Sequence, residues 1–374
     1  MGNEPGGVAS AAAVGPPPGM QVRLSSNESP FGPSPAAIEA ATAVLREAHL
    51  YPDDQSVALR QAIADHDGVP LEQVAVGTGS AALLMDAVQH ECADGGEVVA
   101  FARSFVVYRL GARNAGARYV EVETDGPATG DRDGYGRDVE RLLAAVTDDT
   151  RVVAIDNPGN PTGAHLTGDE LRALVAGVPE HVTILLDEAY HHFAVAPPGA
   201  DRAGDQDGYA TAAELGLEHP RLLVLRTFSK AHALAGMRIG QLTGPAGLVA
   251  SLDAWRTRFN VAAPSQAAAI ASLADRDHLQ RTVQGTLEGR ASMAAGLREL
   301  GVPFTDGLGN FLTIELGTAS EPVVAAYAQH GVGVRPLAPY GMAEQIRVSV
   351  GTPDEVDAFL AASREVLADV PSRG

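Results

Sequence analysis

The sequence contains almost no lysine. Of its 27 basic residues, 26 are arginines and one is Lys230, in the stretch RTFSKAHALAGMRIG at residues 226–240. An arginine side chain stays protonated, so it cannot act as a neutral amine nucleophile, whereas a lysine can lose its proton and condense with an aldehyde. A single lysine is therefore either a chance remnant on a solvated loop or an amine that the chemistry requires. Its neighbours must decide between these interpretations.

Positive charge, cysteine and long apolar runs are also scarce. A formal net charge of −20 argues against nucleic acid and anionic membrane as partners, because both require clustered cations. The lone Cys92 excludes an intramolecular disulfide, and because no Cys/His spacing resembles a zinc site, we expect no metal. No run reaches the roughly 18 apolar residues of a membrane span, and the start lacks the basic region of a signal peptide. We expect a cytoplasmic protein.

The pattern of apolar residues predicts an α/β fold. Short apolar runs alternate with alanine-rich stretches of helical period, which is typical of parallel strands joined by crossover helices. The strands are expected at residues 73–77, 97–101, 117–122, 151–156, 182–187 and 221–226. From about residue 256 a helical stretch at 265–300 precedes strand signals at 310–316 and 345–350, which predicts a smaller α+β domain. Residues 1–20, rich in Gly, Pro and Ala, are expected to form a flexible arm. We expect a turn-rich connection at 124–136 and a polar loop at 196–215.

Glycine and hydroxyl residues follow several of these strands, at the edge where open α/β sheets bind ligands. Gly79 and Ser80 lie where a strand turns into a helix, so their amides and the helix dipole favour an anion such as phosphate, although such turns are common. Thr227, Ser229 and Arg238 add two hydroxyls and a guanidinium close to the lysine. Together these residues predict a phosphate site beside an amine.

Other polar residues at this edge have two interpretations each. Asp187 ends an apolar run, so it is either a helix cap or loop ion pair, or the partner of a protonated ring nitrogen that makes the ring an electron sink. The asparagines of NPGNPTG (157–163) either belong to an ordinary turn or orient a ring hydroxyl. Tyr190 is either an ordinary half-buried tyrosine or orients the same hydroxyl. Tyr108 could offer an aromatic face to a planar cofactor.

Taken together, these motifs resemble those of a known family. The motifs are, in order, SSNESPFGP (25–33), YP (51–52), NPGNPTG, DEAY (187–190), the lysine stretch, RFN (258–260) and GVGVRPLAPYG…QIRVSVGT (331–352). From about residue 22 to 365 the sequence resembles the histidinol-phosphate aminotransferase branch of the fold-type I pyridoxal-phosphate aminotransferases. The resemblance implies an αβα sandwich with a mostly parallel sheet in a large domain at 46–255, and a smaller α+β domain from 21–45 and 256–374. It also favours the interpretation of Lys230 as an amine that the chemistry requires over that of a chance remnant.

The resemblance implies pyridoxal 5′-phosphate as cofactor, bound to Lys230 as a Schiff base, in a homodimer. Lys230, Asp187 and Tyr190 would be the catalytic residues, and Asp187 would pair with the ring nitrogen. Asn160 and Tyr190 would contact the ring hydroxyl, and Tyr108 would stack on the ring. The resemblance implies phosphate contacts for Gly79, Ser80, Ala81, Thr227, Ser229, Arg238 and the partner subunit's Tyr51. It implies substrate contacts for Asn27, Arg335 and Arg347.

The implied activity is transfer of an amino group from a donor to a 2-oxo acid. The donor would be histidinol phosphate or an aromatic or other amino acid, because two arginines could hold a phosphate or a carboxylate. Three departures from the family pattern leave the substrate open: Ala81 follows Gly-Ser, Arg103 replaces a proline and His192 replaces a glutamate. His192 and His232 are expected to be packing residues near the cofactor. Decarboxylation with the same cofactor is an alternative, and simple ligand binding is disfavoured because it needs no amine base.

Overall fold

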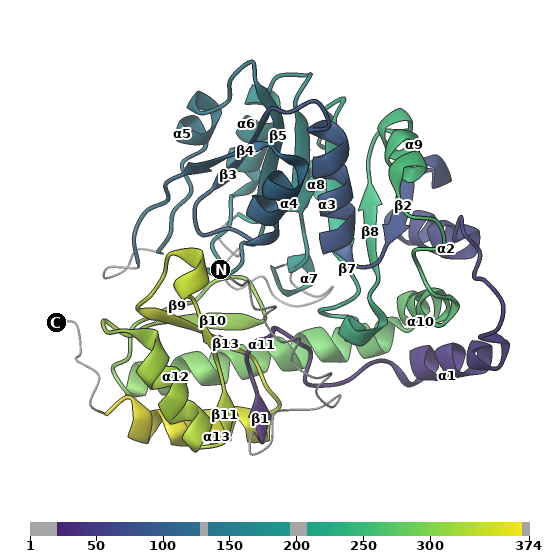
Figure 1. Cartoon of the computed structure of the whole chain (residues 1–374). Coiled ribbons are helices and arrows are strands. Elements are labelled where there is room, and N and C mark those ends of the chain that lie inside the picture. Colours follow the sequence, from purple (N-terminus) through teal and green to yellow (C-terminus); the bar gives the residue numbers. More distant parts are fainter. Residues whose placement is uncertain (1–20, 128–133, 195–207, 369–374) are drawn as a thin grey trace, which may run out of the picture.

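The computed structural model describes residues 21–127, 134–194 and 208–368. The predicted arm at 1–20 lies outside the described residues, as do 128–133 and 196–207 of the predicted connection and loop. Figure 1 shows a large sheet with helices on both faces and, below it in that view, a smaller unit of short strands and helices. None of the helices in the described ranges is long and apolar enough to cross a membrane.

The large sheet has seven strands in the order β2-β8-β7-β6-β5-β3-β4. They are β2 (Val74–Gly77), β3 (Glu97–Phe101), β4 (Arg118–Val122), β5 (Thr150–Asp156), β6 (Thr183–Asp187), β7 (Leu222–Thr227) and β8 (Gly240–Thr243). The mostly parallel sheet is confirmed, and the six predicted strands are present with ends shifted by one residue at most. The sequence interpretation missed β8, which is antiparallel to both β2 and β7. At four residues and with polar members, β8 gives little local signal.

Helices cover both faces of this sheet because its strands are apolar on both faces. In β3, Val98 and Ala100 pack in the core beneath one helical layer, whereas Val99 and Phe101 pack beneath the other. The first layer contains α3 (Ser80–Glu91), α4 (Val107–Ala115) and α9 (Ala246–Trp255); the second contains α5 (Val139–Ala144), α6 (Gly168–Gly177) and α8 (Ala212–Leu215). The short α7 (His191–Ala194) follows β6.

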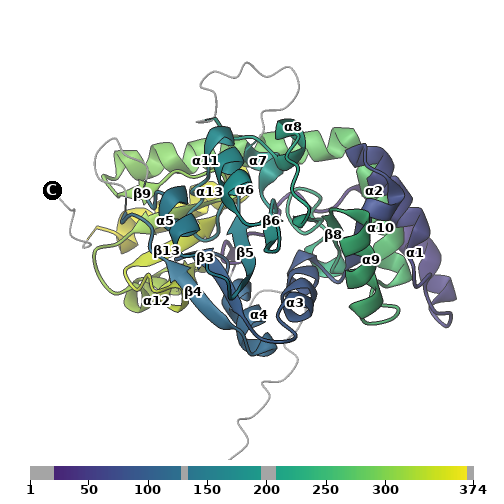
Figure 2. The ribbon, with the colours of Figure 1, turned by 90° about the horizontal axis from the view of Figure 1, so that it is seen from above.

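A third core lies at the β2 end of the large sheet. Here α1 (Pro35–Val44), α2 (Val57–Asp67) and α10 (Ala263–Ala274) pack around β2, as Figure 2 shows from above. The long α11 (Arg276–Glu299) runs from this end to the small sheet. The helical stretch predicted at 265–300 is thus two helices, interrupted at Asp275, whose side chain caps α11 by accepting a hydrogen bond from the His278 amide at 3.1 Å.

The smaller unit contains an antiparallel sheet in the order β12-β13-β10-β9 and a parallel pair of β1 and β11. The strands are β1 (Val22–Arg23), β9 (Phe304–Thr305), β10 (Phe311–Glu315), β11 (Val332–Gly333), β12 (Arg335–Pro336) and β13 (Gln345–Ser349). Its core also includes α11, α12 (Ser320–Gln329) and α13 (Pro353–Val366). Short 3-10 helices are η1 (Leu45–Glu47), η2 (Leu71–Gln73), η3 (Ala235–Met237) and η4 (Ala338–Tyr340). The predicted domain boundaries remain a prediction.

Candidate active site

The carboxyl ends of β5, β6 and β7 meet at one edge of the large sheet beside a cavity of about 550 Å³. Parallel pairing brings these ends together, with Asp156 directly opposite Asp187. Segments of the smaller unit form the facing wall. The predicted site residues that line the cavity are Asn27, Ser80, Ala81, Asn160, Asp187, Tyr190, Thr227, Ser229, Lys230, Arg238, Arg335 and Arg347.

Lys230 follows β7 and points into this cavity. Its Nζ donates a hydrogen bond to the carbonyl of Asn27 at 3.1 Å and lies 5.6 Å from the centre of the Tyr190 ring. Burial, with a smaller contribution from the charge of Arg347, lowers the pKa of Lys230 to about 8. The amine can therefore lose its proton close to neutral pH.

Asp187 is the last residue of β6 and is 3% exposed. Its Oδ1 accepts a hydrogen bond from the Ala189 amide at 3.0 Å. Burial raises the pKa of this carboxyl to about 7, and the neighbouring charge of Asp156 adds to the effect. A cationic ligand group placed against Asp187 would offset the unfavourable burial of its charge.

The amino end of α3 and the loop after β7 form an anion-binding corner. Gly79 caps α3 with φ 88°, so the amides of Ser80 and Ala81 lie in the first turn, where no partner exists within the helix. A Cβ atom at Gly79 would lie 2.6 Å from Nη2 of Arg238, so a larger residue would displace this guanidinium from its present position. The hydroxyls of Thr227 and Ser229 are 3.0 Å apart at the same corner. These donors suit a phosphate group.

Two arginines of the smaller unit face each other across β12 and β13. Arg347 is 5% exposed, donates to the side-chain oxygen of Asn160 and to the Ser25 carbonyl, and its Nε has no hydrogen-bond partner. Arg335 donates to the same Ser25 carbonyl at 2.9 Å. Two neighbouring guanidinium groups suit an anionic group of a small molecule.

Asn27 connects this wall to Tyr190. Its side-chain amide donates to the Tyr190 hydroxyl at 2.9 Å, and its backbone, with φ 53°, donates to Oγ of Ser349 at 2.8 Å. Burial raises the pKa of Tyr190 to about 12, so the phenol keeps its proton. Glu28, which the sequence interpretation did not single out, also lines the cavity and pairs with Arg23 at 3.0 Å.

Tyr108 does not line the cavity, which corrects the prediction that its ring stacks on the cofactor. It lies in the first turn of α4 and is fully buried in the core beneath α3 and α4. The ring that lines the cavity is Phe105, which lies edge-on to Tyr108 at 6.1 Å. Both aromatic residues are visible in the sequence, but which of the two rings faces the cavity depends on the residue at which α4 begins.

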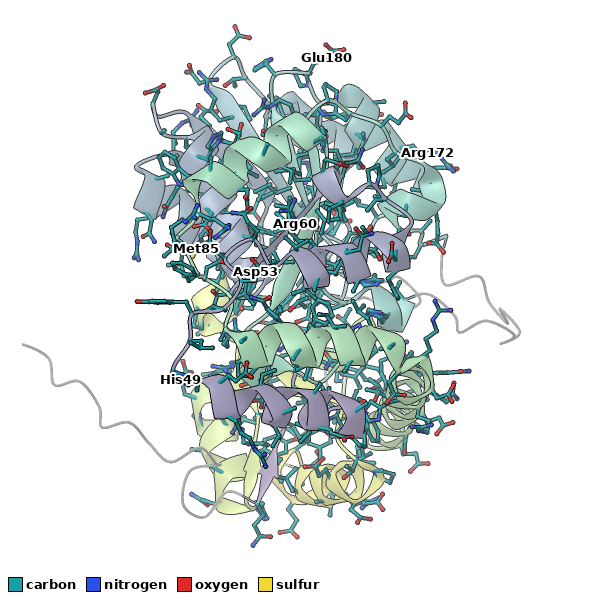
Figure 3. All side chains as sticks on the ribbon, turned by 90° about the vertical axis from the view of Figure 1, so that its right-hand side faces the viewer. His49, Asp53, Arg60, Met85, Arg172 and Glu180 are labelled. Carbon is teal, nitrogen blue, oxygen red and sulfur yellow. The ribbon has the colours of Figure 1, made fainter. Side chains whose placement is uncertain are left out.

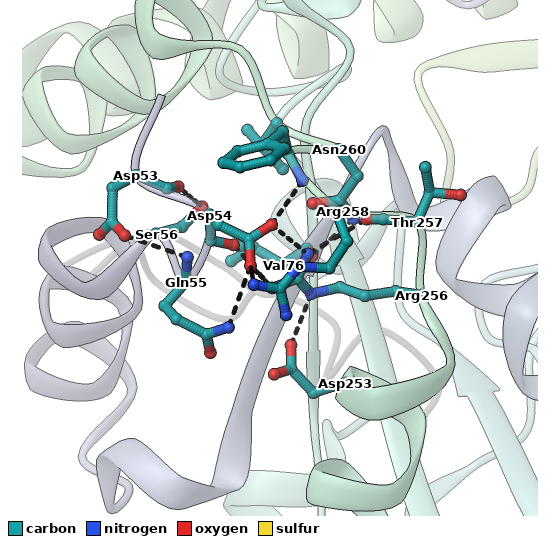
Figure 4. Close-up of polar contacts among 12 residues, drawn as sticks. Asp53, Asp54, Gln55, Ser56, Val76, Asp253, Arg256, Thr257, Arg258 and Asn260 are labelled. Atoms are coloured by element: carbon teal, nitrogen blue, oxygen red, sulfur yellow. Dashed lines mark hydrogen bonds and ion pairs between the residues drawn. The ribbon is translucent and has the colours of Figure 1, made fainter. Parts of the chain in front are cut away.

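Two other predicted contributors lie outside the cavity. Gly79 caps α3 just outside the cavity, and a phosphate contact of its backbone remains a prediction. Tyr51 is 84% exposed and stacks on Phe259, with ring centres 4.8 Å apart. Figure 4 shows the polar contacts that fix this segment: Asp54 binds Arg256, Arg258 and the backbone amide of Phe259. Contact of Tyr51 with a partner subunit remains a prediction.

Of the three residues that depart from the family pattern, Ala81 lines the cavity, whereas Arg103 and His192 lie away from it. Arg103 has φ 56° and donates to the Thr124 hydroxyl at 2.8 Å. The rings of His192 and His232 are 5.3 Å apart and line a separate small cavity behind Thr227. Burial lowers the pKa of His232 to about 3, consistent with a neutral packing residue. Among the described residues, no group of three or more His, Cys, Asp or Glu is arranged to hold a metal ion.

The chain is similar to known proteins over nearly its whole length. The family profile for aminotransferase class I and II matches residues 19–362. Histidinol-phosphate aminotransferase 2 of Methylococcus capsulatus is 40% identical over 92% of this chain and 90% of that protein. An aromatic amino acid aminotransferase of Rhodococcus jostii is 39% identical over 91% of this chain and 88% of its own length. The crystal structure of histidinol-phosphate aminotransferase from Sinorhizobium meliloti in complex with pyridoxal-5′-phosphate aligns with a TM-score of 0.83 and 28% identity, covering 94% of this chain and 92% of that one.

Proposed function

Because the chain belongs to the class I and II aminotransferase family and is a transaminase, we propose that it holds pyridoxal 5′-phosphate in the cavity described above, with Lys230 as its covalent partner. One observation carries this proposal: the single lysine of the sequence lines a cavity that also contains Asp187 and an anion-binding corner. Arginine cannot replace lysine in a covalent bond to an aldehyde carbon.

The residues of the cavity fit this cofactor. The amides of Ser80 and Ala81 and the side chains of Thr227, Ser229 and Arg238 would hold its phosphate. Asp187 would hold the proton on the ring nitrogen, and Phe105 would contact the ring face. Asn160 and Tyr190 would contact the ring hydroxyl.

The chemistry then divides between the cofactor and the protein. When bound, the cofactor supplies an electron sink for the electron pair released from the substrate. Lys230 Nζ, whose pKa is near 8, removes the proton from the α-carbon of the substrate as general base. Asp187, which is 3% exposed, would keep the ring nitrogen protonated.

The substrates are an amino donor with an anionic group and a 2-oxo acid acceptor. Arg347 and Arg335 would hold the anion, assisted by Asn27. The names of the relatives support histidinol phosphate or an aromatic L-amino acid as donor. The lone, buried Cys92 fits a cytoplasmic location.

We also propose that the protein is a homodimer in which Tyr51 reaches the phosphate of the partner subunit's cofactor. Large apolar side chains are exposed on the segments around it, at Ile38, Leu45, Leu50, Tyr51, Val57, Trp255 and Phe259. Figure 3 shows the face formed by α1, α2, α9 and α10, with His49 and Asp53 on either side of Tyr51 in sequence. Exposed apolar clusters of this kind are typical of subunit interfaces.

The function is tested by loading the purified protein with pyridoxal 5′-phosphate and comparing it with Lys230→Arg, which keeps the positive charge. We expect borohydride to fix the cofactor to a peptide containing Lys230 in the parent protein and to none in the variant. Transamination should fall by at least about 10³-fold in Lys230→Arg, because the general base is lost. Full turnover by the variant would contradict the proposal. A panel of donors, including histidinol phosphate and aromatic amino acids, identifies the substrate, and a keto product rather than carbon dioxide distinguishes transamination from decarboxylation.

A further inference from the structure

Asp156 is a second carboxylate at the edge of the cavity, and neither the sequence motifs nor the proposed chemistry assigns it a role. It is the last residue of β5 and pairs in register with Asp187 on β6. Its residue surface is 3% exposed, and it lines the cavity. A buried charge beside another carboxylate is unfavourable unless it is paired, so its partners are informative.

One oxygen of Asp156 binds the backbone of two different loops. Its Oδ2 accepts hydrogen bonds from the Phe105 amide at 3.0 Å and from the Asn160 amide at 2.9 Å. Phe105 belongs to the loop between β3 and α4, and Asn160 belongs to the loop after β5. Both residues line the cavity. A single carboxylate therefore fixes the distance between two walls that come from separate parts of the chain.

The other oxygen of Asp156 binds Arg137. Nη2 of Arg137 donates to Oδ1 at 2.7 Å, and Nη1 donates to the backbone carbonyl of Asp156. The two side chains are 1% and 4% exposed, so this ion pair is buried. The guanidinium carbon also lies 5.5 Å from the centre of the Phe101 ring. Arg137 thus matches the charge of Asp156 and holds its carboxylate in one orientation.

The NPGNPTG motif leaves room for this pair. A Cβ atom at Gly159 would lie 2.1 Å from Nη2 of Arg137, so any other residue at this position would displace the guanidinium. The position of the Arg137 guanidinium beside Asp156 therefore depends on glycine at residue 159.

We propose that Asp156, held and neutralised by Arg137, is a positioning residue that keeps Phe105 and Asn160 in place around the cofactor. This inference rests on the proposed function. The competing explanation is a buried ion pair that stabilises the fold and has no effect on the site. The two explanations differ in what happens when both members of the pair are removed.

The experiment compares Asp156→Leu, which keeps the shape of the side chain but removes both acceptor oxygens, Arg137→Met and the double variant with the parent. Glu91→Gln is the control, because the Glu91 side chain, 6% exposed, also binds an arginine, Arg221, which is 30% exposed, but at the opposite edge of the sheet beside the start of β6. Three quantities are measured: the melting temperature of the unloaded protein, the affinity for pyridoxal 5′-phosphate by absorbance titration, and the circular dichroism of the bound cofactor, which reports its orientation.

We expect each single variant to lower the melting temperature, because one buried charge loses its partner. The double variant, Asp156→Leu with Arg137→Met, should recover part of that loss because no buried charge is left unpaired, yet it should still bind the cofactor about tenfold or more weakly and with altered circular dichroism, since the two amides have lost their acceptor. Glu91→Gln should lower the melting temperature while leaving cofactor affinity within about twofold, because distant sites act independently.

A double variant that binds the cofactor with parental affinity and circular dichroism would overturn the positioning role and leave the proposed function intact. An equal loss of affinity in Glu91→Gln would also overturn it. If the parent protein takes up no pyridoxal 5′-phosphate, the proposed function itself fails, and this inference fails with it.

Discussion

Burial acts on Lys230 and Asp187 in opposite directions. It lowers the pKa of the amine to about 8 and raises that of the carboxyl to about 7. Both groups can therefore change charge within the range in which an enzyme usually works, as groups that move or hold protons require. Neither value follows from the sequence motifs, because each depends on how completely the surrounding chain excludes water.

The reaction of Lys230 with an aldehyde should therefore depend on pH through a value near 8. We expect the rate of cofactor attachment to rise as the pH increases to about 8 and to level off above it, since only the neutral amine reacts. Borohydride trapping at a series of pH values, followed by peptide mapping, separates Lys230 from the chain's amino terminus. A short lysine peptide should show the rise near about 10.4. A rise near that value in the protein would contradict a lowered pKa.

The raised pKa of Asp187 predicts how the stability of the unloaded protein changes with pH. Between its unfolded value of 3.8 and about 7, the folded carboxyl keeps a proton that the unfolded chain releases. The free energy of unfolding should therefore decrease as the pH rises through this range and stay constant above it.

The Asp187→Asn variant should remove this dependence. Its free energy of unfolding should equal that of the parent near pH 4 and exceed it by on the order of 4 kcal/mol at pH 8, as urea titrations would measure. Asp169→Asn is the control for the loss of a carboxyl group, because the Asp169 side chain is 95% exposed. A parent protein that becomes more stable from pH 4 to 7 by the same amount would disprove the assignment.

At the scale of the element, β8 determines how closely α3 approaches the site. Gly240, the first residue of β8, lies against the amino end of α3, and a Cβ atom there would lie 2.2 Å from the Ser80 nitrogen and 2.6 Å from the Gly79 carbonyl carbon. Both atoms belong to backbone, which cannot move aside as a flexible side chain could. The position of the anion-binding corner therefore depends on a strand that local sequence did not reveal.

Gly240→Ala should displace the start of α3. We expect a loss of about 1–3 kcal/mol in unfolding free energy, typical of overpacking, together with weaker binding of the cofactor phosphate. Gly247→Ala in α9 is the matched control: no heavy atom lies within 4 Å of its added Cβ, so the change should be neutral or slightly stabilising. Chemical denaturation and cofactor titration measure both effects. Parental cofactor affinity in Gly240→Ala would show that the close contact has no bearing on the site.

At the scale of the whole molecule, the proposed dimer predicts that two defective subunits can repair each other. Tyr51→Ala and Lys230→Ala should each be nearly inactive as homodimers. In a mixed dimer, the subunit that carries Lys230 would receive the intact Tyr51 of its partner. Random mixing should then restore about a quarter of the parental activity, because half of the dimers are mixed and each has one complete site.

Co-expression with two different affinity tags isolates the mixed dimer, and analytical ultracentrifugation measures the oligomeric state. The absence of recovered activity in the isolated mixed dimer would contradict a shared site. A monomer in the ultracentrifuge at working concentration would contradict the dimer as well.

The pattern of residues alone predicts an α/β fold with parallel strands, and the resemblance to a known family adds the fold-type I architecture and most of the proposed site. Apolar runs reveal buried parallel strands locally, and the residues that follow such strands must meet at one edge of the sheet. Asp187, Thr227 and Lys230 could be identified for this reason before any contact between them was known. The single lysine added a chemical argument that needs no structure.

Three features became known from long-range packing alone: which aromatic ring faces the cavity, the place of β8 between β2 and β7, and the ion pair of Arg137 with Asp156. Phe105 and Tyr108 are separated by the start of a helix, a boundary that local sequence defines poorly. Arg137 and Asp156 come from segments 19 residues apart, and their contact depends on the packing of both segments against the sheet. Contacts of this kind arise from long-range packing, which no local pattern of residues contains.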